Sequence, residues 1–228
     1  MLAGARESLN SVCAIWNIDV LGALSRETSS PERASCPFSL QRSGFVLSEG
    51  GAVLCLEERE SALARGATIL AEVTGYANFS DAVDFTSPAE DCVAREQTIR
   101  WALRAADLQP ADLDYINAHG TSTPLNDINE TRSLKKALGD EAYRIPVSST
   151  KAYSGHLIAA AGSFETIVCL QAMAAGIMPA TAHLTQPDPQ CDLDYIAEGH
   201  RQGEIRRALN LSFGFGGANA ALVLEKHG

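Results

Sequence analysis

The chain has 228 residues, of which 46% are hydrophobic, so it can bury a sizeable core in one large domain or two small ones. Its 28 acidic and 18 basic side chains give a net charge of -10, which argues against nucleic acid as the main partner. The six cysteines form no CxxC pair and no signal-like segment precedes them. We therefore expect reduced thiols and a cytoplasmic location.

The first part of the chain ends in a polar, loop-like run from Ser25 to Gly44, and we place a boundary there. Two β-rich segments follow, GFVLSEGGAVLCLEE and ATILAEVTGY, and a short helix that ends at Gly66 lies between them. Between residues 89 and 108, apolar side chains recur at i, i+3, i+4 and i+7, which predicts an amphipathic helix.

The segment LDYINAHG predicts a buried strand that runs into a loop. Asp127 followed by Glu130 is typical of a capping box, so we expect the next helix to begin there and to end at Gly139. IPVSST predicts a short strand, and Gly155 to Gly176 a long helix. Residues 208–226 predict two strands joined by a glycine-rich turn.

The apolar stretch from Leu157 to Met178 reaches membrane-spanning length. His156, Glu165 and Gln171 lie in or beside it and its centre is rich in alanine, so we interpret it as a buried core helix rather than a membrane anchor. Strands that alternate with helices predict an α/β layered fold, with helices covering both faces of a mixed sheet.

Three polar or glycine-rich loops, residues 117–127, 149–156 and 212–219, each follow a predicted strand. Loops at strand ends are where α/β proteins usually gather their sites. We expect Lys151 in the second loop and His156 in the first turn of the long helix. The helix amino terminus would keep this histidine neutral and able to donate to a developing oxyanion.

A structural alternative exists for each loop. His119 alone is more often a buried structural histidine, and His156 with Ser154 could merely satisfy helix-end groups, although that accounts poorly for Lys151. The GFGG turn can present backbone amides and a movable ring, or it can be a tight hairpin with two packed aromatic residues. The sequence contains no Walker A motif, G-x-S-x-G elbow or zinc spacing, and we expect no cofactor and no metal.

NAHGTSTPLND, VSSTKAYSGHLIAAAGSFE and LNLSFGFGGANAALVLE, in this order, resemble the carboxyl-terminal half of β-ketoacyl-acyl carrier protein synthases. The match looks closer to the type II fatty-acid enzymes than to modular polyketide synthases. The resemblance implies a thiolase-like fold of two βαβαβαββ halves, usually in a homodimer. Residues 44–228 would be the carboxyl-terminal half, and residues 1–43 (strand, helix, loop) a remnant of the amino-terminal half.

The resemblance also implies roles for individual residues. His119 and His156 would polarise the malonyl thioester carbonyl and promote decarboxylation, while Lys151 and Glu165 would orient and support them. Phe215 would be the gating residue. The gate loop would consist of Gly214, Phe215, Gly216 and Gly217.

Further implied features concern the carrier protein and the nucleophile. Thr121 and Thr123 match the threonines that bind the carrier's pantetheine arm. The cysteine that accepts the acyl chain belongs to a segment upstream of this chain, and Met1 would be an internal methionine of an intact synthase. Cys36 stands where the family usually has arginine, and Ser39 and Ser43 replace aspartates, which puts local salt bridges and carrier docking in question.

The leading hypothesis is a subunit of a split β-ketoacyl-acyl carrier protein synthase, which performs decarboxylative Claisen condensation in fatty-acid or polyketide biosynthesis. Its expected partners are an acyl carrier protein, a complementary chain that carries the cysteine, and a second subunit in a dimer or pseudodimer, with neither nucleic acid nor a membrane. The alternative is a non-catalytic truncated synthase that acts as a scaffold. A lone half that only decarboxylates malonyl thioesters is the least favoured hypothesis.

Overall fold

The computed structural model describes residues 1–228 and is built around a five-stranded mixed sheet in the order β3-β9-β8-β4-β5. The neighbours β3, β9 and β8 run antiparallel, whereas β8, β4 and β5 run parallel. The strand bounds are Glu72–Ser80 (β3), Tyr115–Asn117 (β4), Val147–Ser148 (β5), Arg207–Phe213 (β8) and Ala218–Glu225 (β9). The expected mixed α/β sheet is confirmed.

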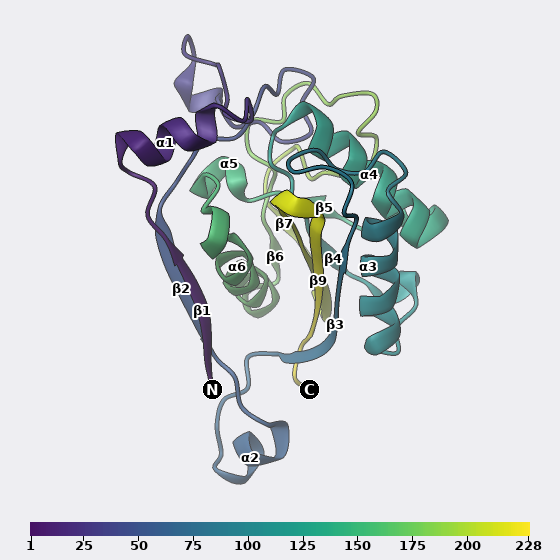
Figure 1. Cartoon of the computed structure of the whole chain (residues 1–228). Helices are drawn as coiled ribbons and strands as arrows, with labels where there is room; N and C mark the ends of the chain where they lie inside the picture. The colour runs from purple at the N-terminus through teal and green to yellow at the C-terminus, as the bar shows by residue number, and fades with distance from the viewer.

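Helices cover both faces of this sheet, as Figure 1 shows. The helices α3 (Val93–Ala105) and α4 (Pro124–Leu138) pack on one face, and α6 (Ala161–Ala175) packs on the other. Beyond α6 lies a second, two-stranded antiparallel sheet of β1 (Leu2–Glu7) and β2 (Gly50–Cys55). The resulting order of layers is β1–β2, α6, the five-stranded sheet, and α3 with α4.

The remaining elements are short. They are α1 (Val12–Asp19), α2 (Arg59–Ala64), α5 (Lys151–Ser154), and the pair β6 (Ile177–Met178) and β7 (Arg201–Gln202), with five short 3-10 turns between them. The predicted strand, helix and strand around α2 are confirmed, and Gly66 follows the helix with a positive φ. The domain boundary at residues 43 and 44 remains a prediction, and β1 pairs with β2 across it.

Two apolar clusters form the core, one on each side of the sheet. Ile99 and Leu134 carry the apolar faces of α3 and α4 onto Leu209 of the sheet. On the other face, Cys169 and Met173 of α6 form the second cluster with sheet residues. All of these side chains are buried, and this burial is the main favourable term that fixes the layers.

The predicted helix start at Asp127 is wrong. The helix α4 begins at Pro124, and the Thr123 hydroxyl caps it by accepting a hydrogen bond from the Asn126 amide. Proline at the first helical position fits because that residue needs no intrahelical donor. Asp127 and Glu130 therefore lie inside the helix, where both are fully buried and bind other parts of the chain.

The single helix predicted from Gly155 to Gly176 is also wrong. Lys151 opens the short helix α5, a 3-10 turn covers Ile158–Ala160, and α6 begins only at Ala161. Gly155 breaks the run with a φ of 68°, and a Cβ there would lie 2.6 Å from the Ser48 Cβ. His156 consequently has extended backbone and forms an isolated parallel bridge with Leu47 instead of a helical turn.

The apolar stretch is a layer of this fold. By length and composition alone, Ile158–Ala175 is the one helical segment that could cross a membrane. Here α6 lies between the five-stranded sheet and β1–β2, and it buries Glu165, Cys169 and Met173 on one face (Figure 1). The predicted core helix is thus confirmed for that face.

Candidate active site

The loops at the strand ends meet at a cavity of about 840 Å³. Six of the residues expected to act together line it: His119, Thr121, Thr123, His156, Gly214 and Phe215. Lys151 and Glu165 are buried and do not line the cavity, and neither do Gly216 and Gly217. The sequence prediction that the three loops form one site agrees with this geometry.

His119 follows β4 and is fixed by a carboxylate from α4. The Glu130 side chain accepts hydrogen bonds from the backbone amides of His119, at 2.7 Å, and Gly120, at 2.8 Å. Gly120 has a φ of 38°, and a Cβ on it would lie 2.4 Å from the Ser149 Cβ. Only glycine lets these two loops approach so closely, and this approach places His119 beside the loop that carries His156.

His156 is held by backbone hydrogen bonds to the segment that leads into β2. Its amide donates to the Val46 carbonyl at 2.7 Å, and its carbonyl accepts from the Ser48 amide at 3.2 Å. Its ring Nδ1 accepts a hydrogen bond from the Ile158 amide at 3.1 Å. An Nδ1 that accepts carries no proton, so the neutral ring carries its proton on Nε2, where it can donate to a ligand.

The two histidine rings lie edge to face. Their centroids are 5.4 Å apart, and the rings make an angle of 79°. Burial, and then the charge of Lys151, holds the pKa of both rings well below the ordinary histidine value. For His119, the charge of Arg95 adds to this effect. Both rings are therefore neutral at pH 7.

The expected neutral state of His156 thus has a different cause from the one predicted. The sequence prediction relied on the amino terminus of a long helix, but His156 precedes that helix and lies in extended backbone. Burial and Lys151 lower its pKa instead.

Lys151 and Glu165 form an ion pair behind the histidines. Their side chains are only 1% and 2% exposed, so each charge depends on the other. Burial raises the pKa of Glu165, and Lys151 opposes that rise. One oxygen of the carboxylate, Oε2, has no partner in the protein. Neither side chain reaches the cavity wall, and the expected support of the histidines by this pair remains a prediction.

The GFGG segment forms a tight turn between β8 and β9, as the glycines predicted. The Gly214 amide donates to the Ala218 carbonyl at 2.7 Å, and the Gly216 amide donates to the Phe85 carbonyl at 2.8 Å. Phe215 projects at 42% exposure, at the edge of the cavity. Gly217 has a φ of 77° and packs so tightly against Asp81 that a Cβ would lie 1.9 Å from its Oδ1.

Thr121 and Thr123 share a hydrogen bond, with 2.9 Å between the two hydroxyl oxygens. Thr123 also caps α4, so its hydroxyl has a structural role whether or not a ligand is bound. Their expected binding of a pantetheine arm remains a prediction, which their position on the cavity wall supports.

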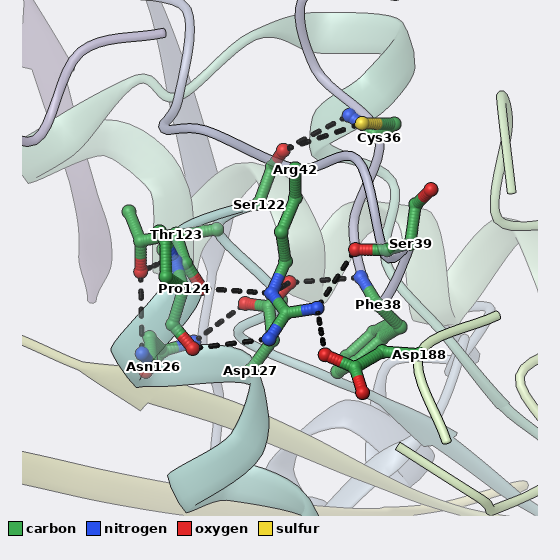
Figure 2. A network of polar contacts seen from close by, with 12 residues as sticks. Cys36, Phe38, Ser39, Arg42, Ser122, Thr123, Pro124, Asn126, Asp127 and Asp188 are labelled. Atoms are coloured by element: carbon green, nitrogen blue, oxygen red, sulfur yellow. Dashed lines mark hydrogen bonds and ion pairs between the residues drawn. The ribbon is translucent and has the colours of Figure 1, made fainter. Parts of the chain in front are cut away.

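A buried network around Arg42 holds the backbone at Thr123, as Figure 2 shows. The Arg42 guanidinium donates to the Thr123 and Pro124 carbonyls at 3.1 Å each, and it pairs with the Asp188 carboxylate at 2.7 Å. Asp127 accepts from the Phe38 amide at 2.8 Å. Arg42 thereby joins the loop that carries it to the start of α4 and to the segment around Asp188.

Cys36, Ser39 and Ser43, the three residues of this loop that depart from the family pattern, each have a hydrogen-bond partner. The Cys36 amide donates to the Ser122 hydroxyl at 3.0 Å, the Ser39 hydroxyl donates to the Gln186 carbonyl at 3.2 Å, and Ser43 contacts Ser25. Since Arg42 forms ion pairs with both Asp127 and Asp188, the loop keeps two buried salt bridges despite the two serines. The consequence for carrier docking remains a prediction.

Sequence reasoning missed Glu130, Asp127, Arg42 and Arg95 as parts of the site. The signal that could have revealed the two acids is the polar face of α4, since Asn126, Asp127, Asn129, Glu130, Thr131 and Ser133 are all buried. A helix with so many polar residues on its inner face must satisfy them against loops or other side chains.

The site therefore combines two neutral histidines with a buried lysine and carboxylate, at the ends of strands of a mixed sheet. Residues 70–185 match the family description "Beta-ketoacyl synthase, C-terminal domain". The chain belongs to the β-ketoacyl synthase family.

Relatives align along the whole chain but extend beyond it. The 3-oxoacyl-[acyl-carrier-protein] synthase 2 of Synechocystis is 45% identical over 227 residues, which cover 100% of this chain and 55% of that protein. The actinorhodin polyketide putative beta-ketoacyl synthase 1 of Streptomyces coelicolor is 43% identical, over 99% of this chain and 48% of that one. The chain thus spans about half the length of these relatives.

Solved structures give the same result. A ketosynthase in complex with its type II polyketide acyl-carrier protein, and bound to the hexaketide, superposes with a TM-score of 0.96 at 41% identity. This match covers 100% of the present chain and 56% of that ketosynthase. A beta-ketoacyl synthase from Burkholderia phymatum gives a TM-score of 0.94 at 37% identity, over 100% and 55% of the two chains. The fold is therefore that of the carboxyl-terminal half of a ketosynthase.

Proposed function

We propose that this chain supplies the decarboxylating part of a β-ketoacyl-acyl carrier protein synthase, which condenses a malonyl thioester with an acyl thioester. The observation that carries the proposal is the neutral histidine pair, in which the proton on Nε2 of His156 is free to donate. The charge of Lys151, which is paired with Glu165, helps burial to keep the two histidines neutral.

The chemistry follows from hydrogen-bond donation to a developing negative charge. The Nε2 proton of His156 is donated to the thioester carbonyl oxygen of the malonyl group, with His119 beside it as a second neutral imidazole. As the bond to the carboxylate breaks, its electron pair moves onto the α-carbon and carbonyl oxygen, and CO₂ leaves. The resulting carbanion attacks the acyl thioester carbonyl, forms the new C–C bond and expels the thiolate.

The acyl group needs a cysteine nucleophile from outside this chain. Four of the six cysteines are buried and two, Cys13 and Cys55, are exposed, and none of the six lines the cavity. Burial raises the pKa of the Cys36, Cys169 and Cys191 thiols, which disfavours the reactive thiolate. The remaining part of a full-length synthase, on a complementary chain, is the proposed source.

The proposed carrier of both acyl groups is an acyl carrier protein. A related ketosynthase has been solved in complex with such a carrier, which supports this assignment. Thr121 and Thr123 would receive the pantetheine arm at the cavity mouth, and Phe215 would move aside as the arm enters. The proposed reaction takes place in the cytoplasm, without a cofactor or a metal.

Co-expression with a complementary amino-terminal segment tests the proposal. The corresponding part of the Synechocystis relative is a suitable source, and the complex would be given malonyl-carrier and an acyl-carrier. We expect β-ketoacyl product that is lost in His119→Gln and His156→Gln variants and retained in His227→Gln, whose ring contacts Glu72 away from the cavity. Product formation that survives both active-site substitutions would contradict the proposal.

A scaffold role is the second candidate, because α1 buries none of its residues and exposes Val12, Trp16 and Val20. Such a surface favours association. A stable complex that forms but transfers no acyl group, with the histidines replaceable at no loss, would favour the scaffold over the enzyme.

A further inference from the structure

Arg95 is a buried cation whose hydrogen-bonding capacity is almost unused. It lies on α3, lines the cavity and is only 6% exposed. Its guanidinium has five donors, yet its one hydrogen bond runs from Nε to the Asn219 Oδ1 at 3.3 Å. Nη1 is buried with no partner at all.

No carboxylate of the chain pairs with Arg95. Glu130 and Asp81 are near enough to influence its pKa, but neither forms an ion pair with it. Glu130 already accepts from the amides of His119 and Gly120, and Asp81 accepts from the Ala89 amide through Oδ2, while its buried Oδ1 contacts no donor, Arg95 included. Burial lowers the pKa of Arg95 to about 10, so the group remains charged at neutral pH.

An unpaired buried charge is costly and is usually matched by an ion or a ligand. Arg95 lies next to the reacting groups, since its Cζ is 4.2 Å from the centroid of the Phe213 ring, and the same ring lies 5.8 Å from that of His119. An anion that pairs with Arg95 would therefore be part of the group that reacts at the histidines.

We propose that Arg95 forms an anion-binding subsite of this cavity, which recognises a negatively charged oxygen on the bound acyl group. The inference rests on the proposed function and adds to it a determinant of substrate choice. Two sources supply this chemistry: the carboxylate of a malonyl extender and the enolate oxygen of a β-keto acyl chain. Neutral, fully reduced acyl groups would gain nothing from Arg95.

Three unreactive probes distinguish these sources: the malonyl, acetoacetyl and butyryl amides of pantetheine. Calorimetric titration of the reconstituted complex would compare the unsubstituted protein with Arg95→Gln and Arg95→Lys, and with Arg104→Gln as an exposed arginine of the same helix. For the probe that carries the recognised oxygen, we expect Arg95→Gln to weaken binding roughly 10-fold or more, as for loss of a charge-assisted hydrogen bond. Butyryl binding should not change.

Each result decides the proposal. Loss confined to the malonyl probe assigns the extender carboxylate, and loss confined to the acetoacetyl probe assigns the β-keto chain. Equal effects on all three probes, or none, would overturn the subsite, while condensation that still needs His156 would leave the proposed function intact.

A second measurement does not depend on pantetheine binding. The side-chain nitrogen signals of Arg95, assigned by their loss in Arg95→Gln, should shift when free malonate is added to the chain and should not shift with butanol. A malonate-induced shift without any condensing activity would support the subsite and contradict the proposed function. Signals that are unaffected by malonate, together with no probe preference, would overturn the subsite.

Discussion

The side chains of Lys151 and Glu165 are almost wholly buried, so removing either charge leaves the other buried without a counter-charge. We expect Lys151→Met to lower the free energy of unfolding by about 3–5 kcal/mol, because an uncompensated buried carboxylate remains. The double substitution Lys151→Met with Glu165→Leu should recover much of that loss, because no charge is then left buried. Urea denaturation of the unsubstituted protein and the two variants measures this.

The exposed pair of Lys135 with Asp192 provides the control, since its side chains are 28% and 46% exposed. Lys135→Met should change the free energy of unfolding by only about 0–1 kcal/mol, because solvent screens the pair. A loss for Lys151→Met that is no larger than for Lys135→Met would show that the inner pair contributes no special stability.

The depressed pKa of His156 makes its contribution to stability depend on pH. The folded pKa lies below the unfolded value near 6.5, so the stabilisation is complete above that pH and is lost as pH falls below it. The unsubstituted protein should lose about 1.4 kcal/mol per pH unit at this site below pH 6.5, and His156→Gln should not.

The measurement compares the unfolding free energies of the two proteins at pH 7.5 and 5.5. The unfolding free energy of the unsubstituted protein, minus that of His156→Gln, should be smaller at pH 5.5 than at pH 7.5 by about 1.4 kcal/mol. Burial raises the pKa of Asp127 to about 6, and this acts in the opposite direction, but it is common to both proteins and cancels. A difference that stays constant with pH would mean that His156 is not held neutral.

At the scale of elements, the GFGG turn between β8 and β9 needs its glycines for two separate reasons. Gly216 has a φ of 73° with open space where a Cβ would stand, whereas Gly217 has a similar φ and packs against Asp81. Gly216→Ala should therefore lower the free energy of unfolding by roughly 1–2 kcal/mol, which is the backbone cost alone. Gly217→Ala should cost roughly 1–3 kcal/mol more, because it must also displace Asp81.

Thermal unfolding would measure the stability of Gly216→Ala and Gly217→Ala, and limited proteolysis would measure how fast residues 81–88 are cleaved in each. We expect faster cleavage of that segment in Gly217→Ala only, because only this Cβ collides with it. Equal behaviour of the two variants would mean that the close approach to Asp81 places no constraint on the turn.

The elements differ in how well the sequence predicts them. The helix α3 and the turn at Gly214 to Gly217 follow from periodicity and glycine content, which act locally. The start of α4 was misplaced because Asp127 and Glu130 fit a capping box, while their actual partners lie 89 and 11 residues away in the chain. Pairing over such distances leaves no signal in local spacing.

The site shows the same division. The histidines, the lysine and the gate were predicted because their motifs match a family. Arg42 and Arg95 were not, since an isolated arginine looks like a surface residue until its burial is known. Even the correct expectation of a neutral His156 rested on a helix terminus that the broken segment around Gly155 does not provide.

For the molecule as a whole, α1 and the β1–β2 sheet expose several large apolar side chains. Val12 and Trp16 of α1, and Leu2 and Val53 of β1–β2, are all more than 60% exposed. We expect the chain alone to self-associate, because apolar patches of this kind are seldom left open on monomers. Light scattering coupled to size exclusion should show oligomers, reduced by Trp16→Glu and unaffected by Leu70→Glu, which alters a separate exposed site. A stable monomer would contradict this expectation.

Backbone hydrogen bonds also connect the β1–β2 sheet to the active site. The backbone of His156 is hydrogen-bonded to Val46 and Ser48, which precede the first residue of β2, Gly50, by four and two positions. If a partner that binds β1–β2 also suppresses opening at His156, thermodynamic linkage requires a ligand held by His156 to strengthen that partner's binding by the same factor. Assembly and activation would then be a single equilibrium, in which amide exchange at His156 slows as the complex forms.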